Sequence, residues 1–114
     1  MTESDTAHEA LSALDVVLDR AITELQAARQ RLGHVMERRN AGAPWREIVD
    51  AEERPLVVES LSRVLDQLSI GGSKFRRAQA QALYAEGLSM ERVASLFGVT
   101  RQRVSALLRD REAS

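Results

Sequence analysis

A regular series of apolar residues at alternating spacings of three and four runs through the first third of the chain. It extends over about four heptads, the pattern of one long helix with a coiled-coil seam. An exposed stripe of this kind would promote aggregation, so another apolar surface must cover it. We expect a homodimer seam here; the alternative cover is a helix at residues 55–69 of the same chain, forming an intramolecular hairpin. The seam consists of Leu11, Leu14, Leu18, Ala21, Leu25, Ala28, Leu32 and Val35.

Glycine and proline mark the limits of this helix and of its neighbours. The long helix is expected to follow a disordered N-terminus at residues 1–7 and to stop near Gly42 and Pro44, because these residue types interrupt helices. A short helix is expected at residues 45–51. The next helix should begin near Pro55, since proline fits the first helical turn.

Residues 71–74 are the clearest candidate for a linker, because two adjacent glycines, Gly71 and Gly72, make a flexible segment. This linker would separate a helical assembly or partner unit at residues 8–70 from a C-terminal unit at residues 75–111. No segment has a convincing strand pattern. The predicted fold is therefore all-α, with a long-helix or helical-hairpin unit followed by a three-helix unit.

The composition points to a cytoplasmic protein with a basic C-terminal part. Cysteine is absent, which excludes disulfides and thiolate metal sites, and no secretion signal or membrane span is recognisable. Residues 1–73 carry eight arginines against thirteen acidic residues, a balance of −5. Residues 74–114 carry one lysine and seven arginines against four acidic residues, a balance of +4. Such a division favours a nucleic-acid-binding end.

Three helices in quick succession are predicted after the linker. The first should cover residues 74–86 and end at Gly87, a residue type common just past a helix. Ser89 is a suitable N-cap for a second helix that runs to Phe97. Thr100 is a suitable N-cap for a third helix that runs to about residue 111.

The spacing within these helices is that of a helix-turn-helix. Gly98 stands in the tight turn, where a positive φ is expected. Ala94 is small at the point where the second and third helices would cross closely. Apolar residues fall where a small core must be filled. These core positions are Val93, Phe97, Val99, Val104 and Leu107.

The segment Ser89–Leu108 resembles the helix-turn-helix in region four of bacterial housekeeping sigma factors, and it is similar to many small bacterial transcriptional regulators. The closest part is Phe97–Val104, and the resemblance covers residues 75–111 only. It implies a DNA-binding domain, and it implies that Arg101 and Gln102 read bases. The family commonly has Glu at the position of Gln102, so the sequence preference need not be shared.

The geometry of a helix-turn-helix indicates how the third helix would meet double-stranded DNA. Its N-terminal turn enters the major groove, where Arg pairs with guanine and Gln with adenine. The expected base-reading residues are Arg101, Gln102, Ser105 and Ala106. Phosphate contacts position the protein without reading sequence. The expected backbone contacts are Arg76, Arg77, Thr100, Arg103 and Arg109.

The function predicted from these features is a sequence-specific, dimeric transcriptional regulator associated with the nucleoid of a bacterium. One alternative is an interaction protein of the transcription machinery that binds RNA polymerase, a sigma factor or another regulator through its acidic N-terminal helices. Another alternative is an architectural, non-specific DNA-binding protein. No catalytic motif is present, and His8 and His34 lack neighbouring ligand residues, so neither enzymatic activity nor a metal or other cofactor is expected.

Overall fold

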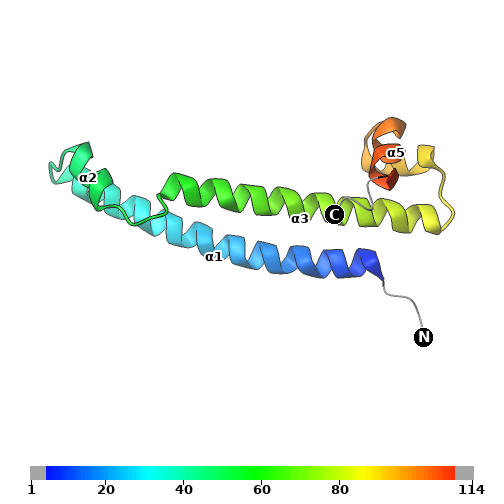
Figure 1. Cartoon of the computed structure of the whole chain (residues 1–114), viewed down its shortest axis with the longest axis horizontal. Coiled ribbons are helices and arrows are strands. Elements are labelled where there is room, and N and C mark those ends of the chain that lie inside the picture. Colours follow the sequence, from blue (N-terminus) through cyan, green and yellow to red (C-terminus); the bar gives the residue numbers. More distant parts are fainter. Residues whose placement is uncertain (1–4, 110–114) are drawn as a thin grey trace. The chain divides into compact units, whose positions relative to one another are not determined.

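The computed structural model describes residues 5–109, and this part of the chain is all-α, as predicted. It contains five helices and no strand (Figure 1). The helices are α1 (Thr6–Asn40), α2 (Trp45–Ala51), α3 (Val57–Ala85), α4 (Met90–Phe97) and α5 (Arg101–Arg109). Within the described residues, no helix has an apolar segment long enough to cross a membrane.

The chain divides into two compact units, and α1 and α3 each run from one unit into the other. The first unit combines residues 1–16 with residues 69–114, of which residues 5–16 and 69–109 are described. The second unit consists of residues 17–68. The beginning of α1 is thus grouped with the C-terminal helices, a grouping for which the sequence offered no signal.

The predicted linker at residues 71–74 is wrong, because these residues lie inside α3. Two glycines weaken a helix by about 1 kcal/mol each relative to alanine. Apolar residues nevertheless recur along one face of α3 on both sides of the glycines, at Val64, Phe75 and Ala78, of which Val64 and Ala78 are buried. The burial of this face outweighs the local preference of glycine.

The N-terminal boundary also differs slightly from the expected one. Thr6 and Ala7, expected in a disordered segment, form the first residues of α1, and the carboxylate of Asp5 accepts a hydrogen bond from the backbone N–H of His8 (3.0 Å). An aspartate at this place satisfies one of the free N–H groups at the start of a helix. The rest of the predicted disordered segment, residues 1–4, lies outside the described residues.

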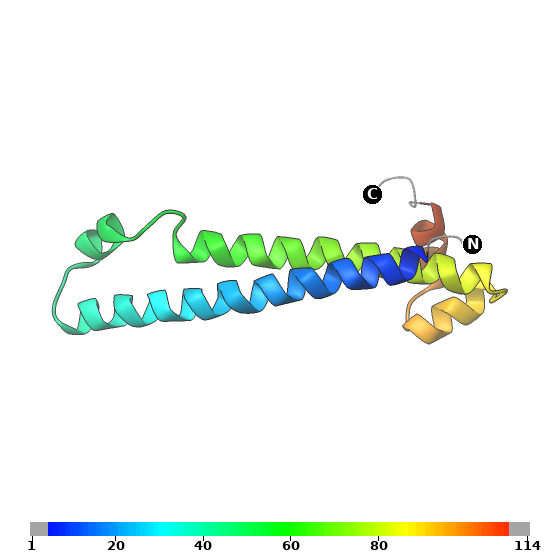
Figure 2. The same ribbon diagram turned by 90° about the horizontal axis from the view of Figure 1, so that it is seen from below.

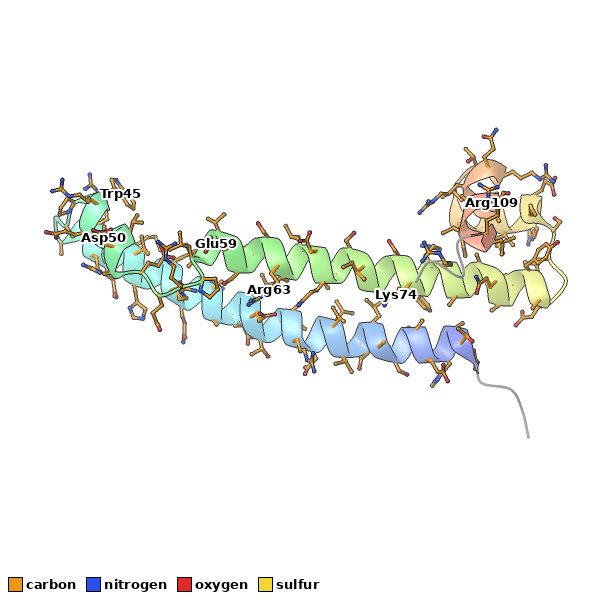
Figure 3. All side chains as sticks on the ribbon, in the orientation of Figure 1. Trp45, Asp50, Glu59, Arg63, Lys74 and Arg109 are labelled. Atoms are coloured by element: carbon orange, nitrogen blue, oxygen red, sulfur yellow. The ribbon has the colours of Figure 1, made fainter. Side chains whose placement is uncertain are left out.

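In the second unit, α1 and α3 lie side by side and antiparallel (Figures 1 and 2). Ala21 and Ala28 of α1 are buried, and so are Val57 and Val64 of α3. Arg63 of α3, labelled in Figure 3, donates a hydrogen bond to the carboxylate of Glu24 on α1 (3.1 Å). The intramolecular hairpin, weighed above as the alternative cover for the heptad seam, is therefore present.

The hairpin covers only part of the heptad seam. Ala21 and Ala28 are 5% and 6% exposed in a single chain, so the prediction that they belong to a dimer seam is wrong. Leu18, Leu25 and Leu32 are between 43% and 45% exposed. Leu14 and Val35 are half-buried, and Leu11 is 47% exposed. The alanines allow close approach of a neighbouring helix, whereas the larger side chains project beside the contact.

Acidic side chains fix the connection between α2 and α3. Glu52 follows α2; its carboxylate accepts hydrogen bonds from the backbone N–H of Val57 (2.9 Å) and from the guanidinium of Arg31 (3.3 Å). Glu59 accepts a hydrogen bond from the backbone N–H of Leu56 (2.7 Å). These contacts satisfy free N–H groups at the start of α3, which is why this helix begins at Val57 rather than at Pro55.

The continuity of α3 predicts that Gly72→Ala stabilises the protein. A Cβ at residue 72 would have no heavy atom within 4 Å, so the substitution adds helix propensity without a clash. The expected gain is about 1 kcal/mol, or a rise in Tm of about 4 °C, measured by circular dichroism.

Gly98→Ala is the matched control, because Gly98 has a φ of 69° that disfavours a side chain. It should lower the Tm by a comparable amount. An unchanged or lower Tm of Gly72→Ala would contradict a continuous helix at this point.

Candidate nucleic-acid interface

Two capped helices, α4 and α5, form the centre of the candidate interface. The hydroxyl of Ser89 accepts a hydrogen bond from the backbone N–H of Arg92 (3.1 Å). The hydroxyl of Thr100 accepts one from the backbone N–H of Arg103 (3.0 Å). Both predicted N-caps are therefore confirmed, and each hydroxyl uses an acceptor site while its own proton stays available to donate. The predicted end of the last helix, residues 110–111, lies outside the described residues.

Glycine forms the two sharp turns of this unit. Gly87 follows α3 with a φ of 101°, and the N–H of Leu88 returns to the carbonyl of Leu83 (3.2 Å), as in a common helix-ending motif. Gly98 follows α4 with a φ of 69°. In the same turn the N–H of Val99 reaches the carbonyl of Ala94 (3.0 Å). The left-handed conformation predicted for Gly98 is confirmed.

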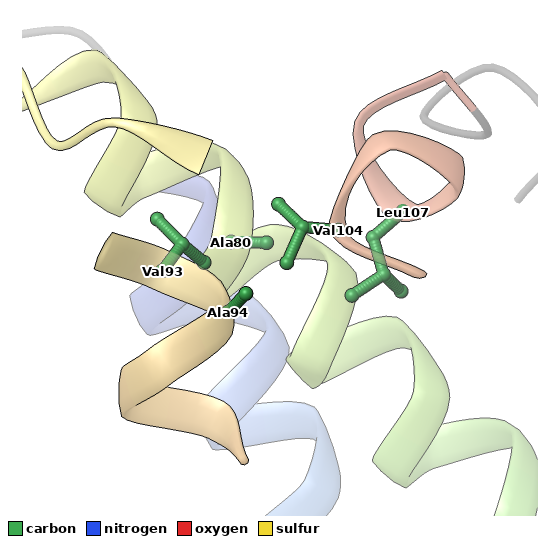
Figure 4. Close-up of a cluster of buried hydrophobic side chains, with 5 residues drawn as sticks. All are labelled: Ala80, Val93, Ala94, Val104 and Leu107. Atoms are coloured by element: carbon green, nitrogen blue, oxygen red, sulfur yellow. The ribbon is translucent and has the colours of Figure 1, made fainter. Parts of the chain in front are cut away.

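A small core holds α4 and α5 together with the C-terminal part of α3. Figure 4 shows how labelled side chains from α3, α4 and α5 come together. They are Ala80, Val93, Ala94, Val104 and Leu107, each no more than 7% exposed. Phe97 is half-buried and packs against this cluster. The predicted core is confirmed at these positions, including the small residue Ala94 beside the crossing.

Val99 is the exception among the predicted core residues. Its side chain is 40% exposed, so the prediction that it fills the core is wrong. The turn after Gly98 uses the backbone N–H of Val99 and leaves its side chain near solvent. Ala80, which the sequence analysis did not single out, is fully buried beside the two short helices.

The predicted base-reading residues gather on the outer side of α5. Arg101 and Gln102 are exposed in its first turn, while Ser105 and Ala106 are half-buried one turn later. Three of them, Arg101, Gln102 and Ser105, line one shallow hollow of about 360 Å³ together with Met90. Ala106 is not among the residues that line it. This exposed arrangement leaves their polar groups accessible to a ligand as large as a duplex.

Glu91 is a residue of the site that the sequence analysis missed. Its carboxylate lies 3.0 Å from Nε of Arg101, and both side chains are largely exposed. The pair links the first turn of α4 to the first turn of α5. An acidic residue in the first turn of a helix is commonly explained by the helix dipole alone, so no pattern of residues indicated this contact.

The predicted backbone contacts occupy different surroundings. The guanidinium of Arg76 lies over the ring of Phe97, 4.2 Å from its centre. Arg77 is half-buried, and its Nε has no hydrogen-bond partner among residues 5–109. Arg103 is exposed, and exposed Arg109, labelled in Figure 3, donates to the hydroxyl of Ser105 (3.0 Å). Arg76, which also donates to the side-chain oxygen of Gln79 (3.5 Å), and Arg103 are therefore exposed at the surface, whereas Arg77 is partly enclosed.

Comparison with protein families gives a match to the Homeodomain-like domain over residues 72–113. The match covers the C-terminal part of α3 together with α4 and α5. Neither the curated proteins nor the solved structures contained a significant match. Together with the crossing of α4 and α5 over a shared core, the match identifies this region as a helix-turn-helix domain, a fold that supports DNA binding.

The close crossing predicts that Ala94→Leu destabilises the domain. Ala94 is 7% exposed among the side chains of the core, so a larger side chain would force α4 and α5 apart. The expected loss is about 1–3 kcal/mol of unfolding free energy, measured by chemical denaturation. Ser95→Leu, at an exposed neighbouring position, is the control and should have little effect. Equal stability of both variants would argue against this packing.

The Glu91–Arg101 pair predicts that Glu91→Gln lowers discrimination between DNA sequences. Loss of the carboxylate removes repulsion of phosphates, so affinity for random duplex should rise. It also frees Arg101 to take orientations that do not fit a base edge, so affinity for a selected site should gain less. The ratio of the two affinities, measured by competition, should fall. An unchanged ratio would show that the Glu91–Arg101 pair has no role in positioning Arg101.

Proposed function

We propose that this protein is a sequence-specific regulator of transcription that binds double-stranded DNA as a homodimer. The observation that carries the proposal is the first turn of α5, where Arg101 and Gln102 are exposed and the helix is capped by Thr100. A recognition helix reads the major groove with this turn. Arg and Gln are the side chains that recognise guanine and adenine in a bidentate manner. The proposed role requires no cofactor and no catalytic step.

Phosphate contacts would come from groups beside the recognition helix. Arg76 and Arg103 are exposed, and the hydroxyl of Thr100 has a proton to donate. Such contacts supply affinity that depends on salt but not on sequence. The basic balance of residues 74–114 is consistent with this division of roles.

We propose promoter DNA as the target, which is what the resemblance of Phe97–Val104 to region four of sigma factors would imply. We propose that the base preference differs from that of sigma factors, because Gln102 replaces their common Glu. A glutamine both donates and accepts hydrogen bonds, whereas an ionised glutamate only accepts. Gln102 therefore favours adenine, and a glutamate would favour the amino group of cytosine.

A second candidate function follows from α2 in the hairpin unit. This helix exposes two apolar side chains, Trp45 (54%) and Val49 (43%). An exposed tryptophan beside an apolar neighbour suits a protein partner in the transcription machinery, such as RNA polymerase or a sigma factor. In this case the protein would occupy promoters without a sequence motif of its own.

In vitro selection from a random duplex library, followed by genome-wide mapping of bound sites, tests the proposal. A shared motif in both experiments is the expected result. Broad coverage without a motif would indicate an architectural protein, and promoter occupancy without selection of a motif in vitro would indicate the partner function. Each of these two results would overturn sequence-specific regulation.

Arg101→Ala should weaken binding to the selected site by about 1–3 kcal/mol and change binding to random DNA little, because a base contact is lost. Arg76→Ala is the control and should weaken both by similar factors, since a phosphate contact carries no sequence information. Competition binding at fixed salt measures both ratios. An Arg101→Ala variant with unchanged specific affinity would place the reading surface elsewhere.

A further inference from the structure

The hairpin of residues 17–68 has one apolar and one polar face. Leu18, Leu25 and Leu32 recur every seven residues on α1 and remain 43–45% exposed after α3 has covered Ala21 and Ala28. Val58 and Leu65 recur every seven residues on α3 and are 71% and 66% exposed. These five residues, with Ile22 and Met36 of α1, are called the apolar stripe below. Ile22 and Met36 are 55% and 61% exposed.

Helix geometry places both parts of the stripe on the same face. Leu25 follows buried Ala21 by four residues, and Leu65 follows buried Val64 by one residue. Around its own helix axis, each exposed leucine is therefore displaced from the buried residue in the same sense, by about 40° on α1 and about 100° on α3. Because α1 and α3 run antiparallel, rotation in the same sense brings the two sets to the same side of the pair.

The opposite face of the hairpin is polar. Glu24 and Arg63, which rotate from the contact in the other sense, form an ion pair at 3.1 Å. The hollow on this side has a volume of about 450 Å³ and is lined by polar residues alone. They are Asp19, Arg20, Thr23, Glu24, Arg63 and Gln67. The hairpin thus has a face suited to water and a face that is not.

We infer that the apolar stripe is covered by the stripe of a second copy of this chain, so that two hairpins form a four-helix bundle. Two features favour an identical copy over a different partner. The seven-residue period occurs on both helices, as in four-helix bundles with coiled-coil packing. Between residues 18 and 36, Arg29 is the one charged residue in line with the stripe, so the stripe offers little charge for an oppositely charged partner to complement.

Arg29 limits the stripe at one edge. It lies in line with Ile22 and Met36, seven residues from each, and it is exposed. Its aliphatic part can lie along apolar surface while its guanidinium reaches water at the edge of the contact. The arginine is therefore compatible with burial of the neighbouring leucines.

The area of the face reaches the minimum expected of a specific interface. The second unit contains residues 17–40 of α1 and residues 57–68 of α3, lengths of about 36 Å and 18 Å at 1.5 Å per residue. With a helix width of about 10 Å, the face measures about 500 Å² on each copy. Two copies would bury about 1,000 Å² in total, the lower bound of specific interfaces.

The purpose of such a dimer rests on the proposed function, because two recognition helices would read a longer DNA site than one. The mass of the full-length protein tests it independently of DNA. Light scattering at micromolar concentration should give twice the 12.7 kDa of one chain. A wild-type mass equal to one chain would overturn the inference, even if that monomer binds DNA.

Leu18→Glu combined with Leu25→Glu should halve the mass while helicity persists, because neither side chain is buried within the chain. Thr23→Glu combined with Gln67→Glu, on the polar face, adds the same charge and should leave the mass unchanged. For random duplex, the monomeric variant should keep the affinity that each recognition helix has in the wild type. For a selected site, its affinity should fall at least tenfold. A leucine variant that is folded and still dimeric would overturn the inference.

Cysteine cross-linking gives a readout that does not depend on a destabilising variant. The chain has no cysteine, so single cysteines at Leu18, Leu25 and Leu32 report only on their own surroundings. Mild oxidation should link two chains through at least one of these positions and not through Thr23→Cys. A cross-link through Thr23→Cys and through none of the three would contradict the interface. A dimer that selects no DNA sequence would instead refute the proposed function alone.

Discussion

The close crossing of α4 and α5 is the constraint on which the DNA-binding region depends. Ala94 lets the helices approach, and Val93, Val104 and Leu107 fill the space against Ala80. Burial of a few apolar side chains orients α5 so that its polar first turn is exposed. Because this core is small, the turn at Gly98 and the caps at Ser89 and Thr100 are also needed to fix where α4 and α5 begin and end.

Much of this arrangement was predictable because it depends on local chemistry. Residue types that cap helices or adopt a positive φ have strong positional preferences, so the limits of α2, α4 and the start of α5 followed from the sequence. The core residues of α4 and α5 followed from the spacing required by a steep crossing. Val99 did not, because its side chain direction is set by the hydrogen bond of its own N–H in the turn.

The features that could not be predicted depend on contacts between distant residues. Gly71 and Gly72 have the composition of a linker, and only the burial of α3 on both sides of them explains a continuous helix. The heptad series predicted a covered seam, but the periodicity is the same whether the cover is the same chain or another. The structure divides the series in two, because the alanines face α3 and are buried while the leucines beside them stay exposed. The Glu91–Arg101 pair joins two helices across a turn and has no pattern in the sequence.

The cap at Thr100 separates two requirements on this position: some residue types would preserve the fold there but not the proposed function. Its oxygen accepts a hydrogen bond from Arg103, and its proton is available for a phosphate. Aspartate caps helices as well as serine does, so it would satisfy the same N–H and the helix would form. It would also add a negative charge to the exposed start of α5, where it would repel an anionic ligand. Position 100 is therefore one at which the fold tolerates more residue types than the proposed binding of DNA does.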